Sequence, residues 1–327
     1  MPPTTRRIDS ATGSDLLEES GAYTPIACRR LHQEWTFGWA DIGCGPFEAP
    51  FFAADLRERL REQAVFFTRE DDLIRYARRF PGIAPTGLVF HMSRCGSTLA
   101  RRMLGTVESA VVLSEPPLIN DLLEPVESVP PSEQVEALLG AALSTMARPD
   151  ADRLDRFYLK CTSWNVLLAD RFRRAALRVL WIFLHRDPVE VLVALERTPP
   201  AWAAPDSWLA QLLGIDPGGS DGERIALILR AYLEAAVREH GRGGGRLVAY
   251  PHLVEQLVDG DLVAFLGLDL DARGRAAMRA VARQDSKRPE RTFKPDARAK
   301  RRRASPAVRA TAKRILGPIY NRVVRLG

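Results

Sequence analysis

The sequence predicts an α/β protein built on a parallel sheet that helices cover on both faces. Two observations lead to this prediction. From residue 87 onward, short apolar runs typical of buried strands alternate with segments of helical character. The chain has 327 residues, of which 46% are hydrophobic, and this is enough to bury a sheet of that kind.

Polar residues follow the expected strands. Arg94, Glu115 and Arg186 come just after the first, second and fourth strand, and Lys160 lies at the end of the third. Ligands of parallel α/β sheets collect outside the carboxyl ends of the strands, so these four residues mark the candidate site. The predicted strands are Gly87–His91, Ala110–Leu113, Arg156–Cys161, Arg178–Leu184 and Arg246–Tyr250.

Composition divides the rest of the chain. The first residues are polar and rich in Ser, Thr and Pro, which is typical of disorder. The next segment alternates short apolar pieces with Gly and Pro, and we expect it to form a cap that packs on the sheet. The predicted parts are a disordered N-terminus (1–20), an N-terminal cap (21–85), an α/β domain (86–304) and a C-terminal helix packed on that domain (305–327).

Helical periodicity is visible within the cap and at the end of the chain. In the cap we predict helices near Ala54–Gln63 and Asp71–Arg79. The C-terminal segment predicts an amphipathic helix that is broken near Gly317–Pro318 and docks on the domain. Its expected apolar side consists of Ile315, Ile319, Tyr320, Val323 and Val324.

The cysteines and the apolar segments of the chain indicate the compartment in which the protein is expected. The four cysteines, Cys28, Cys44, Cys95 and Cys161, form no C-x-x-C pair and have no His at metal-ligand spacing. We therefore predict reduced thiols, with neither a disulfide framework nor a zinc site. The N-terminus has no apolar signal region and no apolar run is long enough to span a bilayer, so we expect a cytoplasmic protein without a membrane partner.

The net charge of +6 is unevenly distributed. From residue 287 to the end, fourteen Lys and Arg stand against two acidic residues, so the basic excess lies in this tail. Such a run is typical of a solvated face, but it also suits a segment that folds over a polyanionic cofactor or an acidic substrate. Nucleic-acid binding is disfavoured because Phe293 and Tyr320 are the only aromatic residues among the basic ones.

The segment from residue 87 to 104 has the pattern of an anion-binding loop between a strand and a helix. Gly96 allows a tight turn in which successive N–H groups point at a ligand, and the helix start adds further donors. Arg94 adds a positive charge, and Ser97 and Thr98 add hydroxyl groups. The loop lacks the Lys and the first Gly of the nucleotide-triphosphatase P-loop, which disfavours a Mg²⁺-dependent ATPase.

Arg186 is a second candidate anion site. It follows the buried run VLWIFL and precedes Asp187 and Pro188, which favour a helix start. Its guanidinium group would present a fork to a phosphate, while Asp187 would cap the helix or orient Arg186. The alternative is a purely structural ion pair between Arg186 and a neighbouring acid.

Glu115 is the candidate general base. A carboxylate at this position would accept the proton of an acceptor group, with His91 in reserve if Glu115 faces away. Its alternative role is to cap a helix that begins near Pro117. Lys160 would donate to a transferred anionic group, or it would be a lysine that reaches from the strand end to solvent.

In this order the motifs resemble those of sulfotransferases that use 3′-phosphoadenosine 5′-phosphosulfate (PAPS), especially the bacterial and tyrosylprotein-type branch. The similarity spans about residues 87 to 268 and depends on several ordered motifs. They are SRCGSTLARRML from Ser93, LSEPP from Leu113, LHRDPVEVLVAL from Leu184, and AYPHLVEQL from Ala249 with FLGL from Phe265.

The resemblance implies a fold and a reaction. The fold is a three-layer α/β/α arrangement like that of P-loop NTPases, with a central parallel sheet, a small N-terminal cap and a basic C-terminal helical tail. The reaction moves the sulfuryl group of PAPS in line to a hydroxyl of a small molecule, sugar or peptide, without a metal. The sequence does not distinguish these acceptors and does not indicate an oligomeric state.

The resemblance also implies site residues. Glu115, Arg94 and Lys160 would be catalytic, and Arg186 would bind the 3′-phosphate. Where the family usually has a Ser, this chain has Ala194, and Arg197 is the nearest substitute. The implied cofactor contacts are Arg94, Cys95, Gly96, Ser97, Thr98, Arg186, Arg197, Tyr250, Lys287, Arg288 and Lys294.

Two other functions remain open. A P-loop-type small-molecule kinase or other nucleotide-binding enzyme would share the strand, loop and helix start but would need Mg²⁺ and ATP. A nucleic-acid-binding protein would use the basic tail, and its affinity would fall steeply with salt. Neither function requires Glu115, Lys160 and Arg186 at successive strand ends.

Overall fold

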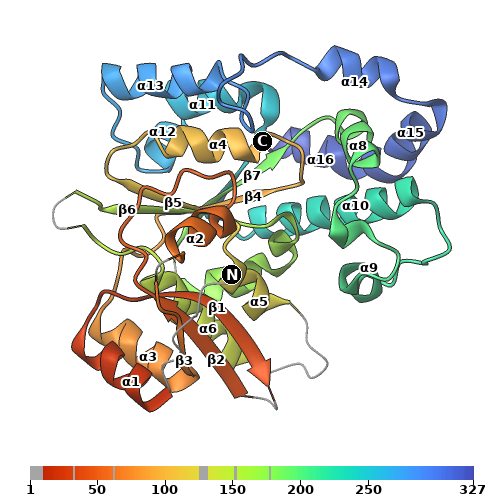
Figure 1. Cartoon of the computed structure of the whole chain (residues 1–327). Helices are drawn as coiled ribbons and strands as arrows, with labels where there is room; N and C mark the ends of the chain where they lie inside the picture. Colours follow the sequence, from red (N-terminus) through yellow and green to blue (C-terminus); the bar gives the residue numbers. More distant parts are fainter. Residues whose placement is uncertain (1–9, 32–33, 62, 125–131, 151–152, 177) are drawn as a thin grey trace. The chain divides into compact units, whose positions relative to one another are not determined.

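A computed structural model describes residues 10–31, 34–61, 63–124, 132–150, 153–176 and 178–327 (Figure 1). Its contacts divide the chain into two compact units. This division differs from the predicted cap, α/β domain and terminal helix, because two strands of the main sheet group with the N-terminal residues. Unit 1 consists of Met1–Leu88, Leu104–Thr162 and Asp170–Val179, and unit 2 of Val89–Met103, Ser163–Ala169 and Leu180–Gly327.

The main sheet has five strands in the order β5-β6-β4-β7-β8. The pairs β5 with β6 and β7 with β8 are parallel. This confirms the predicted α/β class with a central parallel sheet, and each predicted strand is present within two residues at either end. The bounds are β4 (Gly87–His91), β5 (Ala110–Ser114), β6 (Arg156–Lys160), β7 (Leu180–His185) and β8 (Gly245–Ala249).

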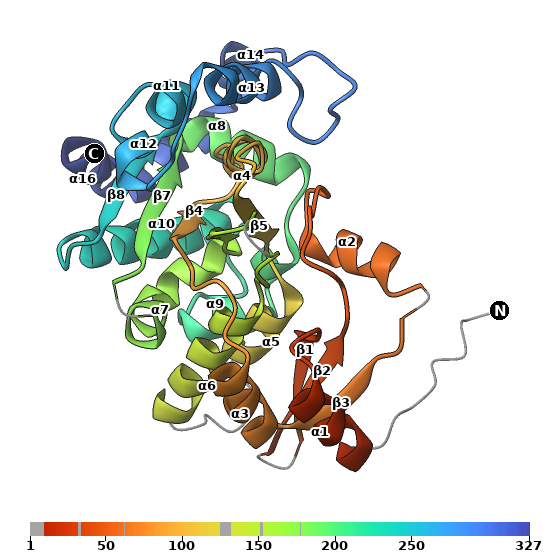
Figure 2. The same cartoon turned by 90° about the vertical axis from the view of Figure 1, so that its left-hand side faces the viewer.

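Unit 1 also contains an antiparallel sheet that we did not predict, in the order β1-β2-β3 (Figure 2). In β2, Trp35, Phe37 and Trp39 occupy alternate positions and have exposed fractions of 1%, 0% and 0%. Strand β1 packs against α5 and α6, so the helices of unit 1 cover this small sheet. The strands are β1 (Thr24–Leu31), β2 (Glu34–Ala40) and β3 (Phe66–Arg69).

The helices of unit 1 include one where we expected disorder. Residues 10–19 form α1, so the prediction of disorder over residues 1–20 is wrong for this part, and residues 1–9 lie outside the described residues. Leu17 is buried, and the Ser14 hydroxyl donates to Asp72 at 3.1 Å, which joins α1 to α3. The helices are α1 (Ser10–Glu19), α2 (Phe52–Arg59), α3 (Glu70–Arg79), α5 (Pro117–Leu123), α6 (Ser132–Thr145) and α7 (Ala169–Ala175).

Unit 2 is organised around the long helix α10 (Asp221–His240), which packs against β8, α8 and the C-terminal helices. No described helix of the chain is long and apolar enough to cross a membrane. The other helices are α4 (Ser97–Leu104), η1 (Ser163–Leu168), α8 (Pro188–Arg197), η2 (Ala201–Ala203), α9 (Trp208–Leu212), η3 (Tyr250–His252), α11 (Leu253–Val258), α12 (Leu262–Phe265), α13 (Ala272–Ala282), α14 (Ala297–Arg303), α15 (Pro306–Thr311), η4 (Ala312–Leu316) and α16 (Gly317–Leu326).

The C-terminal helix packs against α10, and it is not broken at Gly317–Pro318, where we expected a break (Figure 1). Gly317 has helical angles of φ −51° and ψ −51°, and the π-helical turn η4 precedes it. A wider turn before a proline is one way to accommodate its missing N–H. Val323 is buried as expected, whereas Val324 is 51% exposed and does not belong to the buried side.

Candidate functional site

The turn between β4 and α4 has a strained backbone. Ser93 and Arg94 have positive φ angles of 71° and 48°, which residues other than Gly rarely adopt. Outliers of this kind cluster at functional sites, where the surrounding structure maintains them. The Ser93 N–H donates to Nδ1 of His91 at 3.0 Å, so the reserve candidate for the base uses one ring nitrogen to hold the turn.

Arg94 supplies a cation to this loop. Its side chain is partly buried, and within the described part of the chain its guanidinium group has no hydrogen-bond or ion-pair partner. Ser97 and Thr98 stand in the first turn of α4, where backbone N–H groups have no partner inside the helix. Cys95 contributes differently, because its buried thiol donates to the carbonyl of Leu184 at 3.1 Å. A ligand contact at Cys95 therefore has to involve its backbone.

Tyr250 connects the anion loop with Arg186. Gly96 has a φ of +93°, and a Cβ atom there would lie 2.4 Å from Cδ2 of Tyr250. Glycine is therefore required at this position both for the backbone conformation and for the packed ring. The guanidinium carbon of Arg186 lies 4.4 Å from the centroid of the same ring, in a cation–π contact. The two predicted anion-binding motifs thus meet on one aromatic side chain of unit 2.

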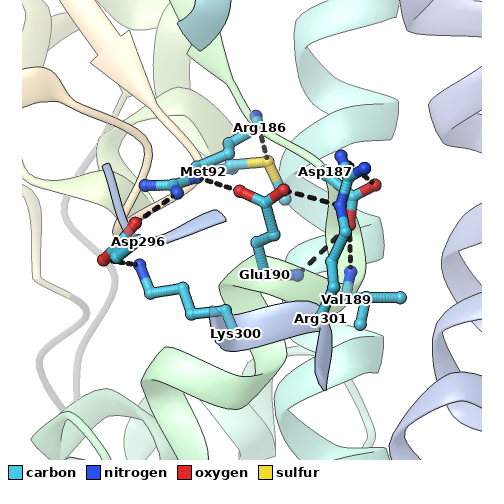
Figure 3. Close-up of polar contacts among 8 residues, drawn as sticks. All are labelled: Met92, Arg186, Asp187, Val189, Glu190, Asp296, Lys300 and Arg301. Carbon is cyan, nitrogen blue, oxygen red and sulfur yellow. Dashed lines mark hydrogen bonds and ion pairs between the residues drawn. The ribbon is translucent and has the colours of Figure 1, made fainter. Parts of the chain in front are cut away.

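Arg186 lies in a network of charged side chains (Figure 3). Its backbone N–H donates to the Met92 sulfur at 3.4 Å, which fixes the chain after β7. Its Nε donates to Glu190 and one terminal nitrogen donates to Asp296, each at 2.7 Å. The side chain of Arg186 is only 7% exposed and that of Glu190 only 4%, so this is a buried, hydrogen-bonded pair.

The C-terminal segment completes the network (Figure 3). Lys300 lies 2.8 Å from the second oxygen of Asp296, and Arg301 lies 2.8 Å from the second oxygen of Glu190 and 3.4 Å from Asp187. The other oxygen of Asp187 caps α8 by accepting from the N–H groups of Val189 and Glu190, at 2.9 and 3.2 Å. Asp187 therefore caps the helix and does not orient Arg186.

The network shifts the pKa values of Arg186 and Asp296. Burial opposes the charge of Arg186, but the hydrogen bonds to Asp296 and Glu190 outweigh this effect and raise its pKa. For Asp296, burial alone would raise the pKa, but the hydrogen bonds from Lys300 and Arg186 lower it. At neutral pH Arg186 and Asp296 are therefore both ionised.

Unit 1 contains the other two catalytic candidates, which form a direct ion pair. Ser114 of β5 is in register with Lys160 of β6, and Glu115 follows with a positive φ of 51°. The Glu115 N–H donates to the Lys160 carbonyl at 2.7 Å, and Nζ of Lys160 donates to Oε1 of Glu115. The strained backbone thus turns Glu115 back onto the end of the neighbouring strand.

The structure answers the alternative roles of these two residues. The residue at the N-cap of α5 is Pro116, and the helix has no side-chain cap, so Glu115 does not cap it. The side chain of Lys160 is 1% exposed, so it does not reach to solvent. The side chain of Glu115 is 20% exposed, and it is the accessible member of the pair. Phe51 lies beside them, with its ring centroid 5.5 Å from Nζ of Lys160.

Several predicted cofactor contacts lie outside this arrangement. Arg197 is exposed in the last turn of α8, roughly 15 Å along the helix from the Asp187 end. Lys287, Arg288 and Lys294 are exposed, and the backbone N–H groups of Lys287 and Arg288 bond to Asp285. The structure therefore does not bring these four residues into the network of Arg186.

Sequence reasoning missed four residues of the network: Glu190, Asp296, Lys300 and Arg301. Glu190 carried a weak signal, since it stands four residues after Arg186 at a helix start, where an acidic side chain is favoured. The other three lie in a tail whose position along the chain no motif fixes, so only tertiary packing identifies them. No group of three His, Cys, Asp or Glu side chains that could hold a metal occurs among the residues that the structure describes.

Comparisons with known proteins found likeness only among solved structures. No protein-family model and no curated protein matches the chain. A sulfotransferase from Mycobacterium avium has 14% identity and a TM-score of 0.48, with 77% of this chain and 80% of that chain covered. A sulfotransferase from Alicyclobacillus acidocaldarius has 16% identity and a TM-score of 0.43, with 74% and 95% covered.

A third solved structure is a sulfotransferase domain from the curacin biosynthetic pathway, with 12% identity and a TM-score of 0.41. The match covers 72% of this chain and 92% of that domain. At such values of identity and TM-score, the functional assignment depends on the residues of this chain.

Proposed function

We propose that the chain is a sulfotransferase that moves the sulfuryl group of PAPS to a hydroxyl acceptor. The contact of Tyr250 with both the anion loop and Arg186 carries this proposal. Through it, the loop that carries Arg94 and the side chain of Arg186 contact the same aromatic ring of unit 2. A nucleotide with anionic groups at both its 5′ and its 3′ position matches such a pair of charges.

The residues of unit 2 fit such a donor. Arg94, the loop N–H groups and the hydroxyls of Ser97 and Thr98 would hold the 5′-phosphosulfate, and Arg186 would hold the 3′-phosphate. PAPS supplies an activated sulfuryl group when bound. Fixed donors at the loop would stabilise the negative charge that develops on the oxygens of that group during transfer. None of the four cysteines forms a disulfide, which is consistent with the cytoplasmic location that we also propose.

Glu115 of unit 1 is the proposed general base. Its carboxylate is partly accessible and takes the proton of the acceptor hydroxyl. Lys160 holds it in place through the ion pair. The acceptor is a hydroxyl of a small molecule, a sugar or a peptide.

Transfer of labelled sulfate from PAPS to three acceptor classes, namely 2-naphthol, a tyrosine peptide and a sugar, tests the proposal. Glu115→Gln keeps the shape but loses the base, so we expect turnover to fall about 10²-fold or more while affinity for the product nucleotide is nearly kept. The matched control is Glu124→Gln, which removes an exposed carboxylate of unit 1 and leaves turnover unchanged.

Two outcomes of this assay would contradict the proposal. Unchanged turnover in Glu115→Gln would show that Glu115 is not the general base. Phosphate transfer from ATP with Mg²⁺, without any consumption of PAPS, would favour the kinase alternative instead.

A further inference from the structure

The guanidinium group of Arg186 is bound by two carboxylates of the chain itself, and they differ in burial. Glu190 is 4% exposed, and its two oxygens bond to Arg186 and Arg301. Asp296 is 48% exposed and lies in the C-terminal segment, just before α14. Releasing Glu190 from Arg186 would break an ion pair between two buried side chains, which is costly. Asp296 is already half in water, so it is the carboxylate that can be exchanged.

The position of Asp296 permits this exchange. It stands at the N-cap of α14, but its side chain makes no capping hydrogen bond, so its departure takes no capping bond from the helix. The ion pairs of Arg301 with Glu190 and Asp187 join α14 to α8 independently of Asp296. The segment would thus remain docked when the Asp296 carboxylate moves away.

Asp296 also holds a second cation at the same place. Its two oxygens bond separately to Arg186, at 2.7 Å, and to Lys300, at 2.8 Å (Figure 3). Lys300 is 17% exposed, so its ammonium group is partly withdrawn from water. Two cations on one carboxylate form a site that a phosphate group, with more charge and more acceptor oxygens, would occupy with the same partners.

We propose that Asp296 is an internal competitor for the anion site of Arg186 and Lys300. The 3′-phosphate of the nucleotide displaces its carboxylate from both cations, and the return of the carboxylate promotes release of the product nucleotide. This inference rests on the proposed function, because it takes the ligand of Arg186 to be that 3′-phosphate. Its distinctive consequence is that removing the Asp296 carboxylate from the site makes the nucleotide bind more tightly.

Titration with 3′-phosphoadenosine 5′-phosphate (PAP), with AMP as the reference ligand, tests the proposal. An internal competitor reduces the apparent affinity by the fraction of time for which it occupies the site. We expect Asp296→Asn to bind PAP about tenfold more tightly than the unmodified chain, through slower dissociation in stopped-flow measurements. Affinity for AMP, which lacks the 3′-phosphate, should not change.

Two variants control for charge and for chemistry. Glu290→Gln removes the same charge from the C-terminal segment, at an exposed residue that pairs with Arg291 at 3.7 Å, and it should change PAP affinity less than about twofold. Asp296→Glu keeps a carboxylate on the segment and should retain the weaker binding of the unmodified chain.

The outcomes separate this inference from the proposed function. Suppose that PAP binds more tightly than AMP, but Asp296→Asn gains no more PAP affinity than Glu290→Gln. The proposal that Asp296 competes for the site is then refuted, and the anion site on Arg186 stands. If PAP binds no better than AMP in either the unmodified chain or Asp296→Asn, Arg186 is not the 3′-phosphate site. In that case both proposals fail.

Discussion

Gly96 is the residue at which backbone conformation and packing impose the same requirement. Its φ of +93° strains any other residue, and a Cβ atom would lie 2.4 Å from the Tyr250 ring. We expect Gly96→Ala to displace the ring from Arg186, to lower PAP affinity about tenfold or more, and to destabilise the fold by about 1–3 kcal/mol. Calorimetric titration and urea unfolding measure the two effects.

Gly214 offers a matched control for that substitution. It has a φ of +62°, but no atom lies within 4 Å of a Cβ atom built on it. Gly214→Ala should therefore destabilise through backbone strain alone, by about 1–2 kcal/mol, and leave PAP affinity unchanged. Equal PAP affinities for Gly96→Ala and the unmodified chain would contradict the role of the Gly96–Tyr250 contact.

Among the site residues, those adjacent to a buried strand are the ones that the sequence predicts best. Arg186 comes two residues after the end of an apolar run whose last residue, Leu184, is 0% exposed, so its place at the strand end could be predicted from hydrophobicity. The partner Asp296 could not, because 110 residues separate it from Arg186 in the chain. The pairing of Glu115 with Lys160 likewise depends on strand order, which no local pattern specifies.

Among the elements, the C-terminal helix is held by a few buried side chains. Leu316 of η4 is 0% exposed, and η4 packs against α10. Leu316→Ala should lower the free energy of unfolding by about 2–5 kcal/mol, because the removed methyl groups leave a cavity. Val324→Ala, at a side chain that is 51% exposed, should change it by less than about 0.5 kcal/mol.

Urea unfolding of both variants gives the comparison. If Leu316→Ala loses no more free energy of unfolding than Val324→Ala, the helix does not stabilise unit 2 through the Leu316 contact.

The strands and helices differ in how well the sequence patterns predicted them. The five strands of the main sheet were predicted because their apolar runs are continuous, as expected for strands buried on both faces. Strand β2 was missed although the aromatic residues Trp35, Phe37 and Trp39 stand at alternate positions, since Gly and Pro in the surrounding segment suggested loops. The helical start at α1 was missed because its polar composition resembles that of a disordered end.

For the molecule as a whole, the burial of His185 is expected to make the free energy of unfolding depend on pH. Burial lowers its pKa from 6.5 to about 4. Below pH 6.5 the unfolded chain binds a proton that the folded chain does not, so stability falls as the pH drops toward 4. At pH 5 this loss amounts to about 2 kcal/mol relative to pH 7.5.

Urea unfolding at both pH values checks this expectation. His185→Leu should lose about 2 kcal/mol less between pH 7.5 and pH 5 than the unmodified chain does. His252→Gln, at an exposed histidine, is the control and should show the same loss as the unmodified chain. A loss in His185→Leu equal to that of the unmodified chain would assign the pH dependence to other groups.

The function of the whole molecule depends on whether its nucleotide site recognises a 3′-phosphate. Calorimetric titration of the full chain with PAP and with AMP is the most direct measurement, because the two ligands differ only in that group. We predict that PAP binds at least about tenfold more tightly, since charge-assisted hydrogen bonds to the buried guanidinium of Arg186 contribute about 1.5–3 kcal/mol. Equal affinities for PAP and AMP would contradict it.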